Sequence, residues 1–293
     1  MDATNPSATP TFANRTPLRI GTVGLIARDL DRLTNYYRDL LGLTVLDRSA
    51  KFALLGAGGV ALLEIEHRPN AKPDDQAHAG LYHTAFLMPT RQDHARWIMH
   101  IVRNQTPISG ASDHGVSEAF YLDDPEGNGI EVYNDRPRER WNWENGLINM
   151  TTKQLDIEAI LKEIEPASAT YLAAPDGLRV GHIHLRVGAI DKAEEFYRGA
   201  LGLELTRRRG GATFMSSGSY HHHVGANVWH SDGAGRRDDD RAGLGWFSVE
   251  SDGAADDATL ARIKAANAPL QPIPGGVETN DPFGTRVRVL KAD

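Results

Sequence analysis

Apolar and polar residues follow one pattern that occurs twice along the chain without a gap. Residues 20–43 (IGTVGLIARDLDRLTNYYRDLLGL) align with residues 180–203 (VGHIHLRVGAIDKAEEFYRGALGL). In each copy, alternating apolar residues predict a β-strand and a polar turn follows it. Apolar residues at helical spacing then predict a helix that ends at Gly42 or Gly202. The pattern therefore predicts a strand followed by a helix in two places.

Two other segments repeat this pattern less closely and extend it. The first contains GLYHTAFLMP at 80–89, a helical pattern at 94–103 and EAFYLDDPEGNGIEVY at 118–133. The second contains GLGWFSVES at 243–251, a helical pattern at 258–266 and NDPFGTRVRVL at 280–290. Both closing segments carry Asp-Pro-x-Gly before a strand, which is typical of a turn that feeds a hairpin. Each unit is therefore predicted as βαβββ.

The four units divide the chain into two halves. Residues 18–138 hold the first pair of units, and residues 179–293 hold the second pair. A helical connector is expected over 139–178, with an amphipathic helix at 154–164. Residues 1–17 (MDATNPSATPTFANRTP) are expected to be a disordered lead-in, because they lack any periodic apolar pattern.

Composition narrows the class of partner and the kind of metal site. The formal net charge of −7 gives no basic footprint for nucleic acid or an anionic membrane, so a small molecule is the expected partner. The chain has no long apolar run and no signal-peptide core at its start, which favours a cytoplasmic location. It has no cysteine, so a metal would have to be held by His, Asp or Glu.

The fourfold pattern, from about Leu18 to Leu290, resembles the vicinal oxygen chelate superfamily. In that superfamily two βαβββ units form an open barrel around a metal, so the resemblance implies an α+β fold of two open mixed barrels. The superfamily includes isomerases, dioxygenases, antibiotic-modifying enzymes and drug-binding proteins. The fold alone does not decide between these functions, so the reaction has to be inferred from the site residues.

Three side chains stand where the superfamily carries its metal: His83, Glu131 and His182. Two imidazoles and one carboxylate leave three positions open on an octahedral ion, which suits Fe(II), and the same ligands would suit Mn(II). His184 competes with His182, because alternation along a strand puts both on one face. His182 is preferred because the repeat places it opposite His83.

The order of these ligands predicts how the units pair. Thr22 offers no good donor in the first unit, and Arg288 stands in the fourth unit where Glu131 stands in the second. A cation at that place would repel a metal. Units two and three are therefore expected to form the metal barrel, with His83 and His182 less than about 10 Å apart, a separation that allows a shared ion. Units one and four would form a barrel without metal.

Residues 112–131 (SDHGVSEAFYLDDPEGNGIE) resemble the signature of extradiol dioxygenases. The matching positions are His114, Phe120–Tyr121, Asp124-Pro-x-Gly and Glu131, and Ser112 is the one departure. The resemblance implies that His114 and Tyr121 line the substrate pocket and give hydrogen bonds to the bound substrate. A phenol and an imidazole can both hold and release protons in that role.

Three adjacent histidines lie in SYHHHVGANVW at 219–229. The resemblance implies an acid–base histidine in this part of the third unit, and His222 fits it best. A regular strand would place His221 and His223 on the opposite face. His223 is the second choice for contact with substrate.

Together these residues predict extradiol cleavage of a small aromatic diol of the catechol type. Dioxygen would be the co-substrate and a muconic semialdehyde the product. The chain carries no flavin or nicotinamide fingerprint, and a homo-oligomer is compatible with the sequence. Two alternatives remain on the same fold: a glyoxalase-like metal-dependent isomerase or lyase, and a metal-free small-molecule-binding protein.

Overall fold

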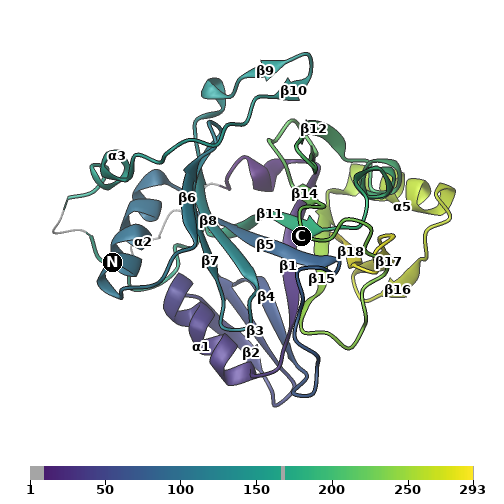
Figure 1. Cartoon of the computed structure of the whole chain (residues 1–293), viewed down its shortest axis with the longest axis horizontal. Helices are drawn as coiled ribbons and strands as arrows, with labels where there is room; N and C mark the ends of the chain where they lie inside the picture. The colour runs from purple at the N-terminus through teal and green to yellow at the C-terminus, as the bar shows by residue number, and fades with distance from the viewer. Residues whose placement is uncertain (1–9, 166–168, 293) are drawn as a thin grey trace, which may run out of the picture.

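The chain folds into two eight-stranded mixed sheets with helices packed around them (Figure 1). This is a computed structural model of the 293-residue chain, and it describes residues 10–165 and 169–292. The two curled mixed sheets and few helices confirm the predicted α+β class. No helix in these ranges is both long and apolar enough to cross a bilayer.

The four predicted units are present, each a strand, a helical segment and three further strands. The first contains β1 (Leu18–Ala27), α1 (Leu30–Leu41), β2 (Thr44–Arg48), β3 (Phe52–Ala57) and β4 (Val60–His67). The second contains β5 (Gly80–Leu87), α2 (Arg91–Arg103), β6 (Gly110–Asp113), β7 (Ser117–Asp123) and β8 (Gly129–Asp135). The third contains β11 (Arg179–Arg186), α4 (Ile190–Glu194), the π-helical turn η4 (Glu195–Ala200), β12 (Glu204–Arg209), β13 (Ala212–Ser216) and β14 (Val224–Asn227). The fourth contains β15 (Gly243–Ser251), α5 (Gly253–Ala265), β16 (Gln271–Ile273), β17 (Gly276–Asn280) and β18 (Arg286–Lys291).

Each sheet joins one unit from each half of the chain. The first sheet has the order β16-β17-β18-β15-β1-β4-β3-β2, and the second has the order β12-β13-β14-β11-β5-β8-β7-β6. The joins are the antiparallel pairs β1–β15 and β5–β11. Units two and three therefore share one sheet, as the order of the candidate ligands required. Units one and four share the other.

Local sequence signals explain where the helices begin and end. At α1, the side chain of Asp29 accepts a hydrogen bond from the backbone N–H of Arg32, which caps the first turn. Gly42 ends the helix with a φ of 67°, a conformation that favours glycine. A Cβ atom there would also lie 2.5 Å from the backbone nitrogen of Ala174, so the connector packs against this turn.

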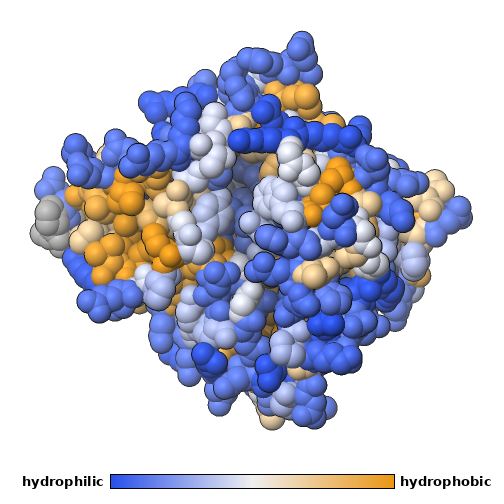
Figure 2. Space-filling view, in the orientation of Figure 1, coloured by the Kyte–Doolittle hydropathy of each residue, from blue (hydrophilic) through white to orange (hydrophobic). Residues whose placement is uncertain are grey.

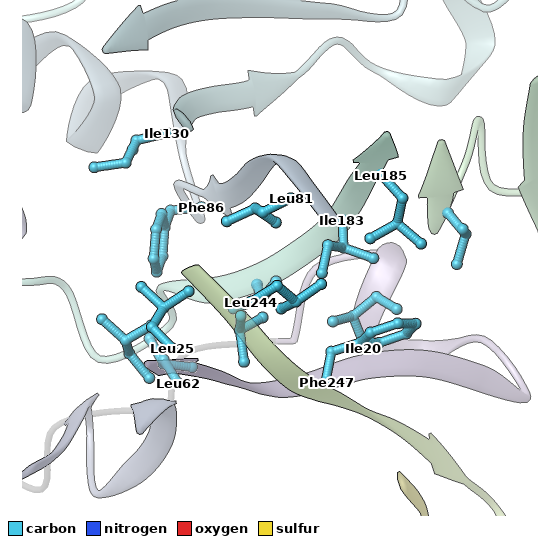
Figure 3. Close-up of a cluster of buried hydrophobic side chains, with 14 of the residues drawn as sticks. Ile20, Leu25, Leu62, Leu81, Phe86, Ile130, Ile183, Leu185, Leu244 and Phe247 are labelled. Carbon is cyan, nitrogen blue, oxygen red and sulfur yellow. The ribbon is translucent and has the colours of Figure 1, made fainter. Parts of the chain in front are cut away.

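The largest core cluster lies where the two sheets face each other (Figure 3). Ile183 and Leu185 of β11 point into this core, and both are fully buried. They alternate with His182 and His184, so those histidines lie on the other face of the sheet. The strand therefore anchors itself with one face and presents imidazoles with the other.

The segment before β1 corrects one expectation. Residues 1–9 of the predicted disordered lead-in lie outside the described residues, but residues 10–17 are docked on the protein. They include the short helix η1 (Ala13–Arg15), and Ala13 and Thr16 are buried. The ring of Phe12 packs against Trp141 and Tyr220 at centroid distances of 6.0 Å. Sparse apolar residues suffice here because partners from elsewhere in the chain cover them.

The connector is less helical than expected. It holds η2 (Arg138–Arg140), a small hairpin of β9 (Trp143–Glu144) and β10 (Leu147–Ile148), and α3 (Ile157–Leu161). The helix expected over 154–164 is thus a short one. The segment after the hairpin is tied to unit two by backbone hydrogen bonds between Asp113 and Lys153. It therefore forms part of the wall above the second sheet rather than a free bridge.

Candidate metal centre

His83, Glu131 and His182 meet on the second sheet, and one candidate ligand atom from each lies within 4.8 Å of the others. The His83 Nε2 is 3.0 Å and the His182 Nε2 is 3.1 Å from the same Glu131 Oε2. The three residues come from β5, β8 and β11, which are adjacent strands of this sheet. Strand pairing thus assembles a ligand set from both halves of the chain.

The protonation states of His182 and Glu131 suit a cation. Burial lowers the pKa of His182 to about 4, so its imidazole is neutral near pH 7 and keeps a lone pair. Burial pushes the pKa of Glu131 up, but the polar contacts of its Oε2 with the His182 and His83 imidazoles, at 3.1 and 3.0 Å, outweigh it and hold that pKa well below the usual range. Metal ligands must be deprotonated in this way.

The hydrogen bonding of His83 gives a second test of whether these residues fit a metal ion. Its Nε2 atom is buried and has no well-aligned hydrogen-bond partner among the described residues. A buried acceptor of this kind is costly unless a partner satisfies it. A divalent cation between the two imidazoles and the carboxylate would satisfy it, so the residues fit a metal.

His184 is a neighbour of this group rather than a member of it. In the sheet register it stands opposite His83, with ring centroids 4.9 Å apart. Its Nε2 atom lies 3.1 Å from the Asn227 amide, and its ring contacts Tyr82 and Trp229. The preference for His182 over His184 therefore agrees with the geometry.

A cavity of about 650 Å³ opens above the candidate ligands. His83, Glu131 and His184 contribute to its floor, and Tyr82, Phe214 and Trp229 give it aromatic walls. The connector residues Met150, Thr151 and Thr152 also line it. Figure 2 shows a hollow on this face, between the segments that Figure 1 labels β6 and β12. The volume is in the range of pockets that hold drug-sized ligands.

His114 and Tyr121 form a hydrogen-bonded pair in the cavity wall. The His114 Nδ1 lies 2.8 Å from the Thr151 carbonyl oxygen, so it carries the proton and donates. The His114 Nε2 is then an acceptor, and the Tyr121 hydroxyl donates to it at 2.6 Å. Burial and the nearby Glu131 raise the pKa of Tyr121 well above its usual value. Tyr121 therefore keeps its proton at all ordinary pH values.

His222 lines the cavity beside the candidate metal ligands. Its ring centroid is 4.0 Å from that of His182 and 5.0 Å from that of Phe214. Its Nδ1 lies 2.8 Å from the Nδ1 of His221, whose Nε2 lies 2.8 Å from Asp135 Oδ1. His222 thus occupies the position expected for it, with a histidine and a carboxylate behind it.

The position of His223 contradicts the expectation that it contacts substrate. His223 does not line the cavity. Its Nε2 is 3.1 Å from the Thr16 hydroxyl, and its Nδ1 accepts a hydrogen bond from the Ser217 backbone N–H. All three histidines precede β14, in an irregular segment with positive φ at Gly218 and Ser219, so strict alternation of faces does not apply. His223 instead holds the docked N-terminal segment.

Asp135, Tyr82 and Trp229 are site residues that the sequence reasoning did not identify. Asp135 could have been found, because it follows Glu131 by four residues in the same strand and so shares its face. Tyr82 and Trp229 carry no comparable signal. Their rings meet at 5.3 Å across strands that only the fold brings together.

The first sheet has an aromatic ring and a cation at the equivalent place. Trp246 pairs with Gly24 in β1–β15 as His83 pairs with His184 in β5–β11. The Arg288 guanidinium lies 3.7 Å from the ring centroid of Trp246, and it forms an ion pair with Glu278 at 2.9 Å. A cation therefore stands in this sheet where the second sheet has Glu131, and a cation there would repel a metal ion.

Two paired βαβββ units around a His, His, Glu group that could hold a metal ion are the arrangement of the vicinal oxygen chelate fold. The model of the Glyoxalase/Bleomycin resistance protein/Dioxygenase superfamily matches residues 19–132 and 179–289, and the chain belongs to that superfamily. It is 35% identical over 269 residues to the catechol-2,3-dioxygenase of Bacillus subtilis, covering 90% of this chain and 93% of that protein.

Solved structures show the same fold at lower sequence identity. A putative dioxygenase from Bacillus subtilis matches with a TM-score of 0.61 and 13% identity, covering 93% of this chain and 84% of that one. Glyoxalase I from Zea mays matches with a TM-score of 0.56 and 17% identity, covering 96% and 94%. At these identities the likeness supports the fold, not a choice between dioxygenase and glyoxalase chemistry.

Proposed function

We propose that this protein is an extradiol dioxygenase that cleaves the ring of a catechol-type substrate at a mononuclear Fe(II) site. The observation that carries the proposal is the grouping of His83, Glu131 and His182 at one aromatic-walled cavity, whose lining includes His83, Glu131 and the His114–Tyr121 pair. The 35% identity to a catechol-2,3-dioxygenase supports the same activity.

His83, Glu131 and His182 would hold the ion. When bound by these three side chains, Fe(II) leaves three coordination positions open and supplies the redox chemistry that couples an aromatic diol to dioxygen. Mn(II) would fit the same ligands. The overall reaction adds both oxygen atoms of O₂ to the ring, breaks a carbon–carbon bond beside the diol, and gives a muconic semialdehyde.

His222 is the proposed base for a substrate hydroxyl. Burial, with His182 and His221 nearby, lowers the pKa of His222 well below its usual value, so the ring is neutral. Its Nδ1 is engaged with His221, so Nε2 is the atom left to accept a proton. The same nitrogen can return that proton later in the reaction.

The His114–Tyr121 pair would hold the oxygen end of the substrate. The Tyr121 oxygen can accept one hydrogen bond from a substrate hydroxyl while its own proton lies on the His114 side. The rings of Tyr82, Phe214 and Trp229 give the cavity apolar surface that favours an aromatic ring and limits water.

Oxygen uptake tests the proposal. The chain is loaded with Fe(II) under nitrogen and mixed with a panel of catechols in aerated buffer, and oxygen uptake and a yellow ring-fission product are recorded. We expect both signals with the wild type and neither with His83→Ala. An absence of oxygen uptake with every catechol and hydroquinone would contradict the proposal.

A glyoxalase-like enzyme would need different residues in the third unit. It would call for a second carboxylate or a glutamine as ligand and base, and His222 stands at that side of the cavity. Isomerisation of a hemithioacetal of glutathione, measured with the same metal-loaded protein, separates the two reactions. The metal-free binding alternative predicts that adding metal changes neither stability nor ligand affinity.

A further inference from the structure

Two arginines in the cavity have no carboxylate partner among the described residues. Arg207 and Arg209 of β12 both line the cavity. Arg207 donates to the Ile148 carbonyl at 3.3 Å, and Arg209 donates to the Thr152 hydroxyl at 3.4 Å. Moreover, the Nε of Arg207 is buried without a hydrogen-bond partner in the described part of the chain. Such a donor is costly unless something satisfies it.

Other cations near the cavity are neutralised. Arg186, which also lines it, forms a buried ion pair with Asp74. Arg208 lies between the two unpaired arginines in sequence and pairs with Glu194 and Asp191. Because side chains alternate along a strand, Arg208 points to the opposite face from Arg207 and Arg209. The unpaired charge is therefore confined to the cavity side of β12.

The cavity's own carboxylates do not balance this charge. They are Glu131, which faces His83 and His182, and Asp123 at the end of β7. In the sheet order β7 and β12 lie near opposite edges. Neither carboxylate forms an ion pair with Arg207 or Arg209 in the described structure. An anion that enters the cavity would supply the missing partner.

The sheet register gives the distance between this charge and the metal centre. Arg207 pairs with Phe214, Phe214 pairs with Gly225, and Gly225 pairs with His184, which stands beside His83. Three strand spacings of about 4.8 Å separate Arg207 from His184, roughly 14 Å along the sheet. The His184 ring lies over Gly225, and the rings of His184 and Phe214 both line the cavity between the candidate ligands and Arg207. A ligand can thus extend from the candidate ligands towards Arg207.

We infer that the natural substrate is a catechol with a carboxylate on a side chain several atoms long, and that Arg207 and Arg209 bind this carboxylate. A planar guanidinium matches the two oxygens of a carboxylate, and paired arginines favour it over a neutral group. The volume of about 650 Å³ also leaves room for more than one ring. This inference rests on the proposed function for the diol end of the ligand.

A binding experiment tests recognition of the carboxylate end of the ligand separately from recognition of the diol end. The full-length chain is stripped of metal with a chelator and titrated under nitrogen with 3-(3,4-dihydroxyphenyl)propanoic acid or with its methyl ester, and each Kd is measured by calorimetry. We expect the acid to bind about 10- to 100-fold more tightly than the ester, as a charge-assisted hydrogen bond at a partly desolvated site would give. Equal affinity would overturn the inference.

Three variants decide whether the arginines recognise the acid or only anchor the connector. Arg207→Gln and Arg209→Gln should each remove most of the preference for the acid and leave the affinity for the ester unchanged. Arg208→Gln, on the other face of the same strand, should keep the full preference. Equal weakening of acid and ester in Arg207→Gln would show that its role is structural, and this would also overturn the inference.

Failure of the carboxylate inference can be distinguished from failure of the proposed function. Neither metal nor oxygen takes part in this titration, so a preference for the acid stands even if no ring is cleaved. Conversely, ring cleavage of neutral catechols with no preference for acids would leave the proposed function intact and remove only the carboxylate site.

Discussion

The Nδ1 atoms of His221 and His222 lie 2.8 Å apart, and the Nε2 of His221 lies 2.8 Å from Asp135 Oδ1. A carboxylate only accepts, so a neutral His221 carries its proton on Nε2 and leaves Nδ1 as an acceptor. His222 must then donate from its own Nδ1, which leaves its Nε2 unprotonated. Asp135 thereby selects the form of His222 that can take a proton in the cavity.

Replacing Asp135 by Asn should lower kcat for ring cleavage by about 10- to 100-fold, a size typical of residues that orient a functional imidazole. The amide can donate to His221 Nε2 and reverse both tautomers, so His222 would carry its proton on Nε2. Steady-state oxygen uptake measures the loss. KM should change little, because Asp135 does not line the cavity.

Tyr220→Phe is the matched control for that variant. It removes the other hydrogen bond to Asp135, from the Tyr220 hydroxyl at 3.2 Å, and keeps the ring against His221. We expect wild-type kcat within about threefold, because the carboxylate still orients His221 and a factor of three is under 1 kcal/mol. If Asp135→Asn retains full kcat, the proposed tautomer selection is wrong.

Adding Fe(II) or Mn(II) under nitrogen should raise the melting temperature of the chelator-treated protein. An ion at 100 times its Kd stabilises the folded state by about 2.7 kcal/mol. For a chain of this size that corresponds to a rise of roughly 4 °C. His83→Ala should abolish the rise, and His67→Ala, on the first sheet, should keep it. A rise that survives His83→Ala would place the metal elsewhere.

Tyr121→Phe should lower kcat by about 100-fold, a loss of the size that a misplacement of bound substrate by about 1 Å can cause. The variant keeps the ring beside His83 but removes the hydroxyl that donates to His114. Metal-dependent stabilisation should be unchanged, because the ligands remain. Tyr36→Phe removes a hydroxyl outside the cavity, bonded to the Asp123 carbonyl, and should leave kcat unaltered. Full activity of Tyr121→Phe would refute its assigned role.

His94 should make the protein sensitive to acid. It is fully buried beside Trp97 and Phe120, and burial lowers its pKa to about 3. Above pH 6.5 both the folded and unfolded states carry neutral histidine, so the free energy of unfolding does not change. Below pH 6.5 the unfolded chain binds a proton that the folded chain excludes, and stability falls by about 1.4 kcal/mol per pH unit.

Urea unfolding at pH 7 and pH 4.5 tests this sensitivity with His94→Phe, which keeps an aromatic ring in place. The variant should lose about 2 to 3 kcal/mol less than the wild type between the two values. His100→Phe, a partly exposed histidine of the same helix, is the control and should behave like the wild type. Equal losses in His94→Phe and the wild type would show that His94 binds a proton as readily in the folded state as in the unfolded state.

The sequence predicted the repeat, the pairing of the units and the grouping of His83, Glu131 and His182, because each depends on short-range periodicity. His83 and Glu131 stand at fixed places in strands, and the absence of donors at Thr22 and Arg288 excluded the other pairing. The contact between Asp135 and His221 joins residues 86 positions apart. It depends on sheet curvature and on the irregular turn at 217–220, which a strand pattern does not encode. Arg207 and Arg209 look like ordinary surface charges until the register places them over Phe214 and Ala212.

The pairing of β5 with β11 sets the point in protein synthesis at which the three candidate ligands come together. Glu131 and His182 lie 51 positions apart in the sequence, with the connector between them. During synthesis, the first half leaves the ribosome with His83 and Glu131 but without its third ligand or its partner strands. The ion can bind the full ligand set only after β11 has joined β5. If the proposed function is correct, metal binding should therefore follow completion of the fold, and a half-made chain should not retain the ion.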